Sequence, residues 1–192
     1  MAKTIFIITG FKDKASDSQY KWMRTFFKKK GFIVKIPSIK WNHRVMSDYV
    51  DEFRQYYEEN KSEKNYVLGF SYGAMIAFIS AHELKPAKLY LCSLSPYFNE
   101  DLRTLKPWWK RFIGIHRLKD FKQYIAKSIA KNLAIPTVVF YGTREAKRYP
   151  ELKVRCEETS KLAPKAKLVS IKDAPHRVDH PEYVEAIKKE FA

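Results

Sequence analysis

The chain has 192 residues, of which 45% are hydrophobic and 15% aromatic, so it can bury a sizeable core and is not a disordered polypeptide. Lysine and arginine outnumber the acidic residues by 37 to 21, a net charge of +16, but no nucleic-acid-binding motif accompanies this charge and we expect no nucleic-acid partner. Two cysteines cannot build a disulfide framework or a zinc site, and no apolar run suits a signal peptide or membrane span, so we expect a cytoplasmic protein.

Short apolar segments alternate with amphipathic segments from one end of the chain to the other. The apolar segments predict six strands, at residues 4–10, 31–36, 65–70, 87–93, 135–142 and 166–171. Helices are expected at residues 16–30, 46–60 and 74–83, and a last one begins at Pro181. This alternation is typical of a mostly parallel sheet with helices on both faces, in which ligands bind beyond the carboxyl ends of the strands.

Residues 96–134 interrupt the alternation, because no strand is evident between the fourth and fifth apolar segments. Tryptophan, phenylalanine and tyrosine residues are interleaved here with lysines and arginines. The pattern predicts one or two amphipathic helices inserted after the fourth strand. No internal repeat, low-complexity tract or linker marks a second domain, so we expect a single domain over residues 1–192.

A serine between two glycines stands where the third strand meets the third helix, in the sequence Gly69-Phe70-Ser71-Tyr72-Gly73. A sharp strand-to-helix turn holds a serine hydroxyl clear of the sheet, and small residues two before and two after it let strand and helix pass each other. The alternative is an ordinary glycine-flanked turn. Because the chain has only six glycines, the pattern in this context favours a reactive serine.

A reactive serine needs a base, which histidine supplies most often. His176 lies five residues after the sixth strand, in a loop at the functional edge of the predicted sheet. His180 directly precedes Pro181 and fits a helix-capping or supporting role better. We therefore assign the base to His176, a choice that the family resemblance described below also supports.

The base in turn needs a carboxylate to orient it, best supplied from another strand end. Glu145 follows the fifth strand, three residues after Gly142, and neighbouring cations would keep it ionised. A surface glutamate paired with those cations is the alternative. Asp173 and Asp179 are further candidates, but they share the loop of the histidine and would have awkward geometry.

An oxyanion formed at the reacting carbonyl needs two amide donors. The amide of Tyr72, directly after the serine, is the first candidate. The second is the amide of Phe11, in the loop that follows the first strand, where Gly10 lets the chain turn close to the site.

These residues resemble the α/β-hydrolase superfamily, specifically its small single-domain serine hydrolases. The order Ser71, Glu145, His176 is the order that this family uses. The stretches IFIITGF, VVFYGTRE and DAPHRVDHPEYVEAI resemble its oxyanion loop, acid loop and histidine loop, so the resemblance covers essentially the whole chain. The chain differs from the family in three ways: Thr9 stands where a histidine is common, the acid is a glutamate where aspartate is commoner, and the family's first two strands have no counterpart.

The resemblance implies a three-layer α/β-hydrolase fold with a minimal six-stranded sheet, and a helical lid or cap at residues 96–134. It implies a carboxylesterase that cleaves a small-molecule ester through an acyl-enzyme, without cofactor or metal. Ser71 would attack, His176 would transfer protons and Glu145 would orient the imidazole. The aromatic residues of the insertion either pack it onto the sheet or shape the substrate pocket, to which we assign Trp108, Trp109 and Phe112.

The same machinery would serve a thioesterase, lactonase, amidase or acyltransferase. It would also serve a lipase that docks its basic, aromatic insertion on anionic interfaces. An alternative of another class is a non-catalytic binding module with this fold, for nucleic acid or an acidic partner. The net charge of +16 is the observation that suggests this alternative.

Overall fold

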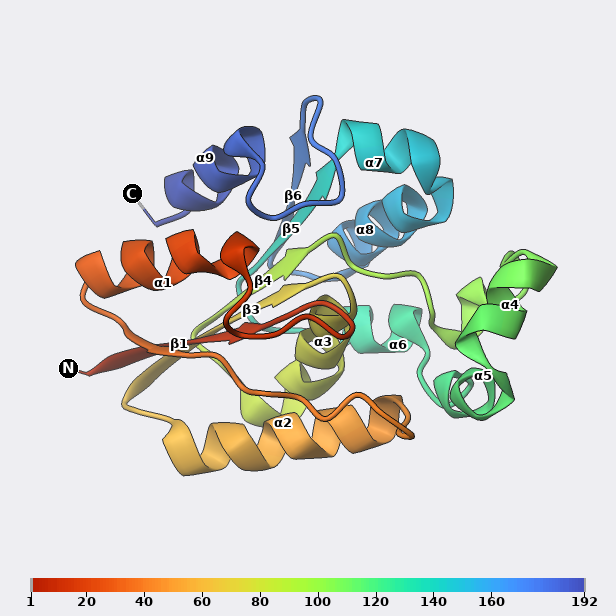
Figure 1. Ribbon diagram of the computed structural model, residues 1–192, viewed down its shortest axis with the longest axis horizontal. Helices are drawn as coiled ribbons and strands as arrows, with labels where there is room; N and C mark the ends of the chain where they lie inside the picture. Colours follow the sequence, from red (N-terminus) through yellow and green to blue (C-terminus); the bar gives the residue numbers. More distant parts are fainter. Residues whose placement is uncertain (1, 192) are drawn as a thin grey trace.

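The computed structural model describes residues 2–191 and contains a six-stranded sheet in which all strands are parallel (Figure 1). The strands lie in the order β2-β1-β3-β4-β5-β6, with these bounds: β1 (Lys3–Ile8), β2 (Ile33–Lys35), β3 (Lys64–Phe70), β4 (Lys88–Cys92), β5 (Thr137–Gly142) and β6 (Ala166–Ile171). All six predicted strands are confirmed. The edge strand β2 is the shortest, and all three of its residues pair with β1.

Helices cover both faces of the sheet, as predicted (Figure 1). One face packs against α1 (Ser18–Lys29) and α9 (Pro181–Lys189), and the other against α2 (Met46–Asn60), α3 (Tyr72–Leu84) and α8 (Pro150–Leu162). The strand period of two divides β1 between the two cores, with Ile5 and Ile7 in one and Phe6 and Ile8 in the other. The result is a three-layer α/β architecture.

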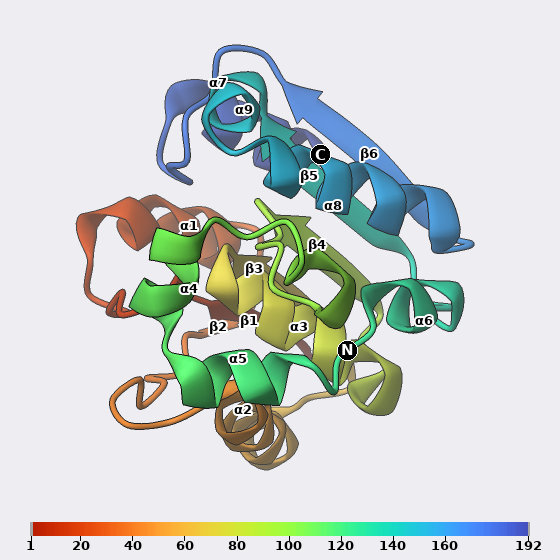
Figure 2. The ribbon, with the colours of Figure 1, turned by 90° about the vertical axis from the view of Figure 1, so that its right-hand side faces the viewer.

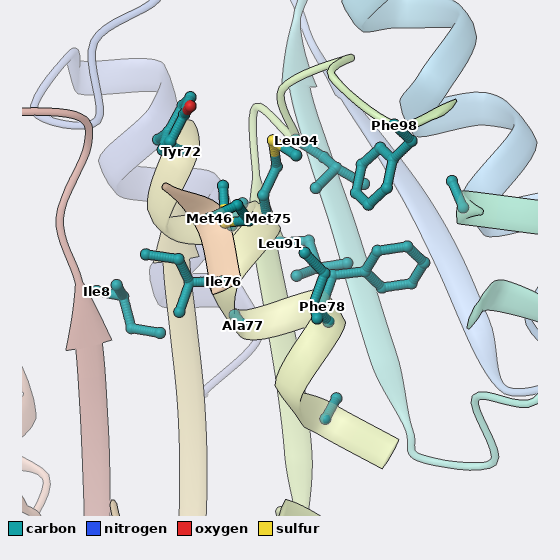
Figure 3. Packing of buried hydrophobic residues seen from close by; sticks show 14 of the residues in the cluster. Ile8, Met46, Tyr72, Met75, Ile76, Ala77, Phe78, Leu91, Leu94 and Phe98 are labelled. Atoms are coloured by element: carbon teal, nitrogen blue, oxygen red, sulfur yellow. The ribbon is translucent and has the colours of Figure 1, made fainter. Parts of the chain in front are cut away.

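Helix α3 is buried on nearly all sides, as expected from its uniformly apolar sequence. Its side chains pack between the sheet and the start of the insertion, where Ile76 lies near Ile8 and Phe78 contacts Phe98 edge-on at 5.7 Å (Figure 3). This packing holds the first turn of α3, and with it the Ser71 turn, firmly against the sheet.

The insertion at residues 96–134 is more broken than predicted. It contains a 3-10 turn (Asn99–Asp101) and three short helices, α4 (Pro107–Ile113), α5 (Ile115–Phe121) and α6 (Ala126–Lys131). Gly114, at φ 86° and ψ 152°, separates α4 from α5, because glycine adopts this non-helical backbone conformation far more readily than other residues. Helices α4 and α5 lie beyond the carboxyl ends of the strands (Figures 1 and 2).

Hydrogen bonds fasten the insertion to the rest of the molecule. The Ser47 hydroxyl, at the start of α2, donates to Asp120 of α5 at 2.7 Å. Within the insertion, Glu100 accepts from the amides of Ala126 and Lys127.

In the part of the chain that the structure describes, no helix combines the length and apolarity needed to cross a bilayer.

Candidate active site

Ser71 occupies the strained turn between β3 and α3 that its glycine-flanked sequence predicts. Its backbone lies at φ 56° and ψ −114°, a conformation that non-glycine residues rarely adopt. A Cβ atom at Gly69 would lie 2.3 Å from the carbonyl oxygen of Gly73, and one at Gly73 would lie 2.3 Å from that of Ile8. Both glycines are therefore required for strand, turn and helix to approach this closely.

The structure brings His176 and Glu145 to this serine. His176 Nε2 lies 3.0 Å from Ser71 Oγ, and His176 Nδ1 lies 2.7 Å from Glu145 Oε2. The carboxylate accepts a hydrogen bond from the Nδ1–H group, so Nε2 is left with a lone pair that faces the serine hydroxyl. The imidazole is also packed against the Phe70 ring at a centroid distance of 4.9 Å. This arrangement can remove the proton from Ser71 as it attacks.

Glu145 is buried, with 0% of its side chain exposed. Its Oε1 accepts from the Gly142 amide at 2.6 Å and from the Ser93 hydroxyl at 2.8 Å. We expected cations on the same loop to keep the carboxylate ionised. Instead, the Gly142 amide, the Ser93 hydroxyl and the His176 ring surround it, and within residues 2–191 no side-chain hydrogen bond or salt bridge joins it to Arg144, Lys147 or Arg148.

Ser93 and Tyr183 extend this network behind the acid. The Ser93 hydroxyl uses its single O–H to donate a hydrogen bond to Glu145, so the Tyr183 hydroxyl, 2.8 Å away, donates to Ser93. Burial raises the pKa of Tyr183 well above its usual value, and the Glu145 charge adds to the shift, so the phenol remains a donor. The sequence reasoning did not find these two residues; the only signal was a polar Ser93 directly after an apolar strand.

The acid loop and the histidine loop meet through their backbones. The amides of Arg144 and Glu145 both donate to the Ala174 carbonyl at 3.2 Å. A Cβ atom at Gly142 would lie 2.2 Å from that same carbonyl oxygen, so only glycine allows the approach. Helix α7 (Thr143–Arg148), which was not predicted, begins here and places Glu145 in its first turn.

The other candidates for the acid and the base do not join this hydrogen-bonded chain. Asp179 forms a salt bridge with Arg177 at 2.8 Å, and Asp173 occupies a turn at φ 53°; neither carboxylate is hydrogen-bonded to His176. His180 takes the N-cap position of α9, but its side chain makes no capping bond there. The structure therefore assembles Ser71 with the favoured histidine and the favoured acid.

The two predicted amide donors stand close to the turn. Phe11 follows β1 and its ring packs against that of Tyr72 at 5.1 Å. Among residues 2–191, neither the Phe11 amide nor the Tyr72 amide donates a hydrogen bond to a protein group, so both are available to a ligand. Thr9, in place of the histidine common in the family, is buried and bonds to the Asp13 carbonyl.

A cavity of about 750 Å³ opens directly over Ser71 and His176. The three aromatic residues assigned to the pocket, Trp108, Trp109 and Phe112, all line it. Trp108 and Phe112 are 61% and 68% exposed, which places them at the mouth of the cavity. Ser95 also lines the cavity, with its hydroxyl 3.3 Å from that of Ser71. The described residues include no cluster of three or more histidine, cysteine or acidic side chains suited to a metal ion.

Known proteins resemble this chain in structure but not in sequence. No protein-family model and no curated protein sequence matches the chain. Among solved structures, Est1E from Butyrivibrio proteoclasticus superposes on 99% of this chain and 87% of its own length, with a TM-score of 0.80 and 16% identity. An α/β-hydrolase enzyme from a sediment metagenome of the Mar Chica lagoon, MGS-MChE2, matches 100% of this chain and 90% of its own, with a TM-score of 0.72 and 19% identity.

The chain has the α/β-hydrolase fold. A structure described under carboxylesterases of Nitrososphaera gargenis shares it too, with a TM-score of 0.74, 14% identity and 99% and 89% coverage of the two chains. The sheet of this chain consists of the six strands that the sequence predicted, and Ser71, Glu145 and His176 meet at the carboxyl ends of its strands.

Proposed function

We propose that this protein is a carboxylesterase that uses Ser71, His176 and Glu145 as a catalytic triad. The observation that carries the proposal is the continuous hydrogen-bonded chain from Ser71 Oγ to His176 Nε2 at 3.0 Å and from His176 Nδ1 to Glu145 at 2.7 Å. A buried carboxylate, a correctly oriented imidazole and a strained nucleophile turn at the floor of a cavity are the parts that acyl transfer needs.

The reaction follows from the geometry. Ser71 Oγ attacks the ester carbonyl carbon while its proton passes to His176 Nε2, and the oxyanion binds the amides of Tyr72 and Phe11. His176 then protonates the departing alkoxide, which releases the alcohol and leaves an acyl-serine. Water then gives a proton to the same nitrogen and attacks the acyl carbonyl; as the bond to Ser71 Oγ breaks, His176 returns that proton to Oγ, which releases the acid and regenerates Ser71. Glu145 stabilises the imidazolium in both steps.

The cavity supports an ester with an aromatic or short apolar part. Its walls carry the rings of Trp108, Trp109 and Phe112 beside the proposed nucleophile. Est1E, one of the structural matches, has been seen with ferulic acid bound, an aromatic acid, and that structure matches 100% of this chain at 15% identity. Residues 96–134 supply those rings, so we assign the insertion the role of a lid within a single domain.

A fluorophosphonate probe tests the proposal because it labels only an activated serine. The label should map to the tryptic peptide 65–88, which contains Ser71, and Ser71→Ala should abolish it. Ser128→Ala, an exposed serine on α6, is the matched control and should label like the wild type. Absence of labelling in well-folded protein, or a label on peptide 89–103 with Ser95, would contradict the assignment; the first result would favour a non-catalytic binding module.

A lipase is the second candidate, favoured by one observation. Trp108 and Phe112 expose 61% and 68% of their surface at the mouth of the cavity, and Ile115, at the start of α5, exposes 77%; basic residues of the insertion stand beside them in the sequence. Such a patch suits an anionic lipid interface. Nitrophenyl esters of increasing chain length, assayed below and above their micellar concentration, distinguish the two: an esterase prefers the soluble esters and a lipase gains rate at the interface.

A further inference from the structure

The cavity over Ser71 is lined by an excess of positive charge. Lys12, Lys106, Arg117 and Arg148 line it, whereas Glu151 is its one acidic lining residue, a net charge of 4 − 1 = +3. Within the described residues none of the four cations forms a salt bridge, although arginines elsewhere, such as Arg44 and Arg155, do pair with acids. Unpaired cations that surround a cavity favour an anionic occupant.

Arg117 is the cation that the structure holds in place. Its Nε donates to the Arg44 carbonyl at 3.2 Å and its Nη2 lies 3.4 Å from the Trp41 carbonyl oxygen. The guanidinium stacks over the Phe11 ring at 5.1 Å, beside a proposed oxyanion donor. No described carbonyl or carboxylate oxygen accepts a hydrogen bond from its Nη1, although the guanidinium also lies beside the Tyr49 hydroxyl; a planar donor therefore remains available in the cavity wall.

Further cations flank Ser71 and His176. The Lys12 ammonium lies 5.5 Å from the centroid of the same Phe11 ring. On the side of the histidine, Arg148 stacks over Tyr149 at 5.4 Å, and the Tyr149 ring lies 6.2 Å from that of His176. The positive charge is thus placed on both sides of the reacting atoms rather than at one distant point on the surface.

We propose that the site prefers esters that carry a negatively charged group, such as a carboxylate, away from the scissile bond. The proposal rests on the esterase function proposed above and adds its substrate class. The reaction is the same hydrolysis, in which water is consumed and the charged group is unchanged. Arg117 would bind that group through the free side of its guanidinium, while the net charge of +16 would speed the approach of an anion.

Two matched ester pairs test this preference. On the acyl side, 4-nitrophenyl hemiadipate is compared with the uncharged 4-nitrophenyl heptanoate; on the alcohol side, 4-carboxyphenyl acetate is compared with 4-acetylphenyl acetate. Because a hydrogen bond to a charged group corresponds to roughly tenfold or more in an equilibrium constant, we expect kcat/KM to favour the anion by about tenfold in at least one pair. The pair that shows it identifies which half of the ester carries the charge.

Variants separate a local contact from long-range attraction. Arg117→Gln should lower the anion-to-neutral ratio by about tenfold while the neutral ester is still hydrolysed. Arg24→Gln, on α1 and outside the cavity, removes the same charge and should leave the ratio unchanged. If Arg117→Gln fails to fold, the exposed Arg148→Gln replaces it.

The two proposals fail differently. If the wild type hydrolyses the neutral esters in a Ser71-dependent way but shows no preference for an anion in either pair, the substrate class is wrong and the esterase function stands. An anion preference that Arg117→Gln and Arg148→Gln leave unchanged also overturns the proposal. If no ester is cleaved and the fluorophosphonate probe does not react, the esterase function itself is wrong.

Discussion

Replacing Glu145 with glutamine tests the acid assignment by changing one atom. The carboxylate accepts a hydrogen bond from the Gly142 amide on Oε1 at 2.6 Å and one from the His176 ring on Oε2 at 2.7 Å. A glutamine has the same shape but presents one oxygen and one NH₂ group. Because the Gly142 amide can only donate, the glutamine oxygen must take the position of Oε1. The other orientation would bring two donors within 2.6 Å of each other.

The NH₂ group of Glu145→Gln then faces His176 Nδ1. That nitrogen has to become an acceptor, so the imidazole proton moves to Nε2 and points at Ser71. The wrong tautomer cannot take the serine proton. In a serine protease, the equivalent carboxylate-to-amide change lowers kcat by about 10⁴-fold with the geometry intact, and we expect a loss of similar size here. Because shape and the Gly142 contact are kept, the fold should be retained.

The assay is the kcat for 4-nitrophenyl acetate, with the free energy of unfolding measured beside it. Asp173→Asn and Asp179→Asn, in the histidine loop, are the matched controls and should keep kcat within about twofold, as surface changes do. A Glu145→Gln variant with kcat within tenfold of the wild type would refute the tautomer argument. A large loss in Asp173→Asn instead would move the acid to that residue.

Three further predictions concern stability. Gly73→Ala should lower the free energy of unfolding by about 3 kcal/mol or more, measured in urea, because the new Cβ would lie 2.3 Å from the Ile8 carbonyl oxygen; an unchanged midpoint would contradict this. Asp101→Asn should cost about 3 kcal/mol because it leaves the buried Arg155 without its main partner, whereas Glu158→Gln, the more exposed partner, should cost less than about 1 kcal/mol. Stability should also fall above pH 10, because burial raises the pKa of several tyrosines (to about 12 for Tyr57) and the unfolded chain releases phenol protons that the folded chain retains. Tyr90→Phe removes one such group. Between pH 10 and 11 the free energy of unfolding, measured in urea, should therefore fall less steeply with pH in the variant than in the wild type, by up to about 1.4 kcal/mol per pH unit. Equal slopes in the variant and the wild type would contradict this mechanism.

The strands and the serine turn could be predicted because their signals are local. Apolar runs mark buried parallel strands wherever they occur, and a Gly-x-Ser-x-Gly sequence carries its own steric reason. His176 was predictable from its loop position, since the carboxyl ends of parallel strands meet at one edge of the sheet, together with the family resemblance.

Helix α8 was not predicted because its buried face is not apolar. The residues it buries are Leu152, Arg155, Cys156 and Thr159, so two of the four are polar and the usual apolar spacing is absent. Arg155 is only 2% exposed and is tolerated there because Asp101 accepts from its Nε at 3.1 Å. That partner comes from the insertion, far away in sequence, so the helix is stabilised by a contact that local patterning does not contain.

Ser93 and Tyr183 were missed for a related reason. Each becomes informative only once the strand order is known, because β4 lies beside β5 and so brings Ser93 within reach of Glu145. Tyr183 reaches the same point from α9. A hydroxyl at a strand end carries no signal of its own; the signal is the buried carboxylate that needs a donor.

The position of the site is determined by backbone contacts rather than by the insertion. A Cβ atom at Gly69, Gly73 or Gly142 would come within 2.3 Å of a backbone carbonyl oxygen. Half of the six glycines therefore lie where the Ser71 turn and the Glu145 loop pack closely against neighbouring backbone segments. The insertion contributes cavity walls, such as Trp108 and Arg117, but none of these backbone contacts. Substitutions in the insertion should therefore change which ester is preferred and leave the reaction of Ser71 with a small probe nearly unaffected, whereas substitution of these glycines should reduce both together.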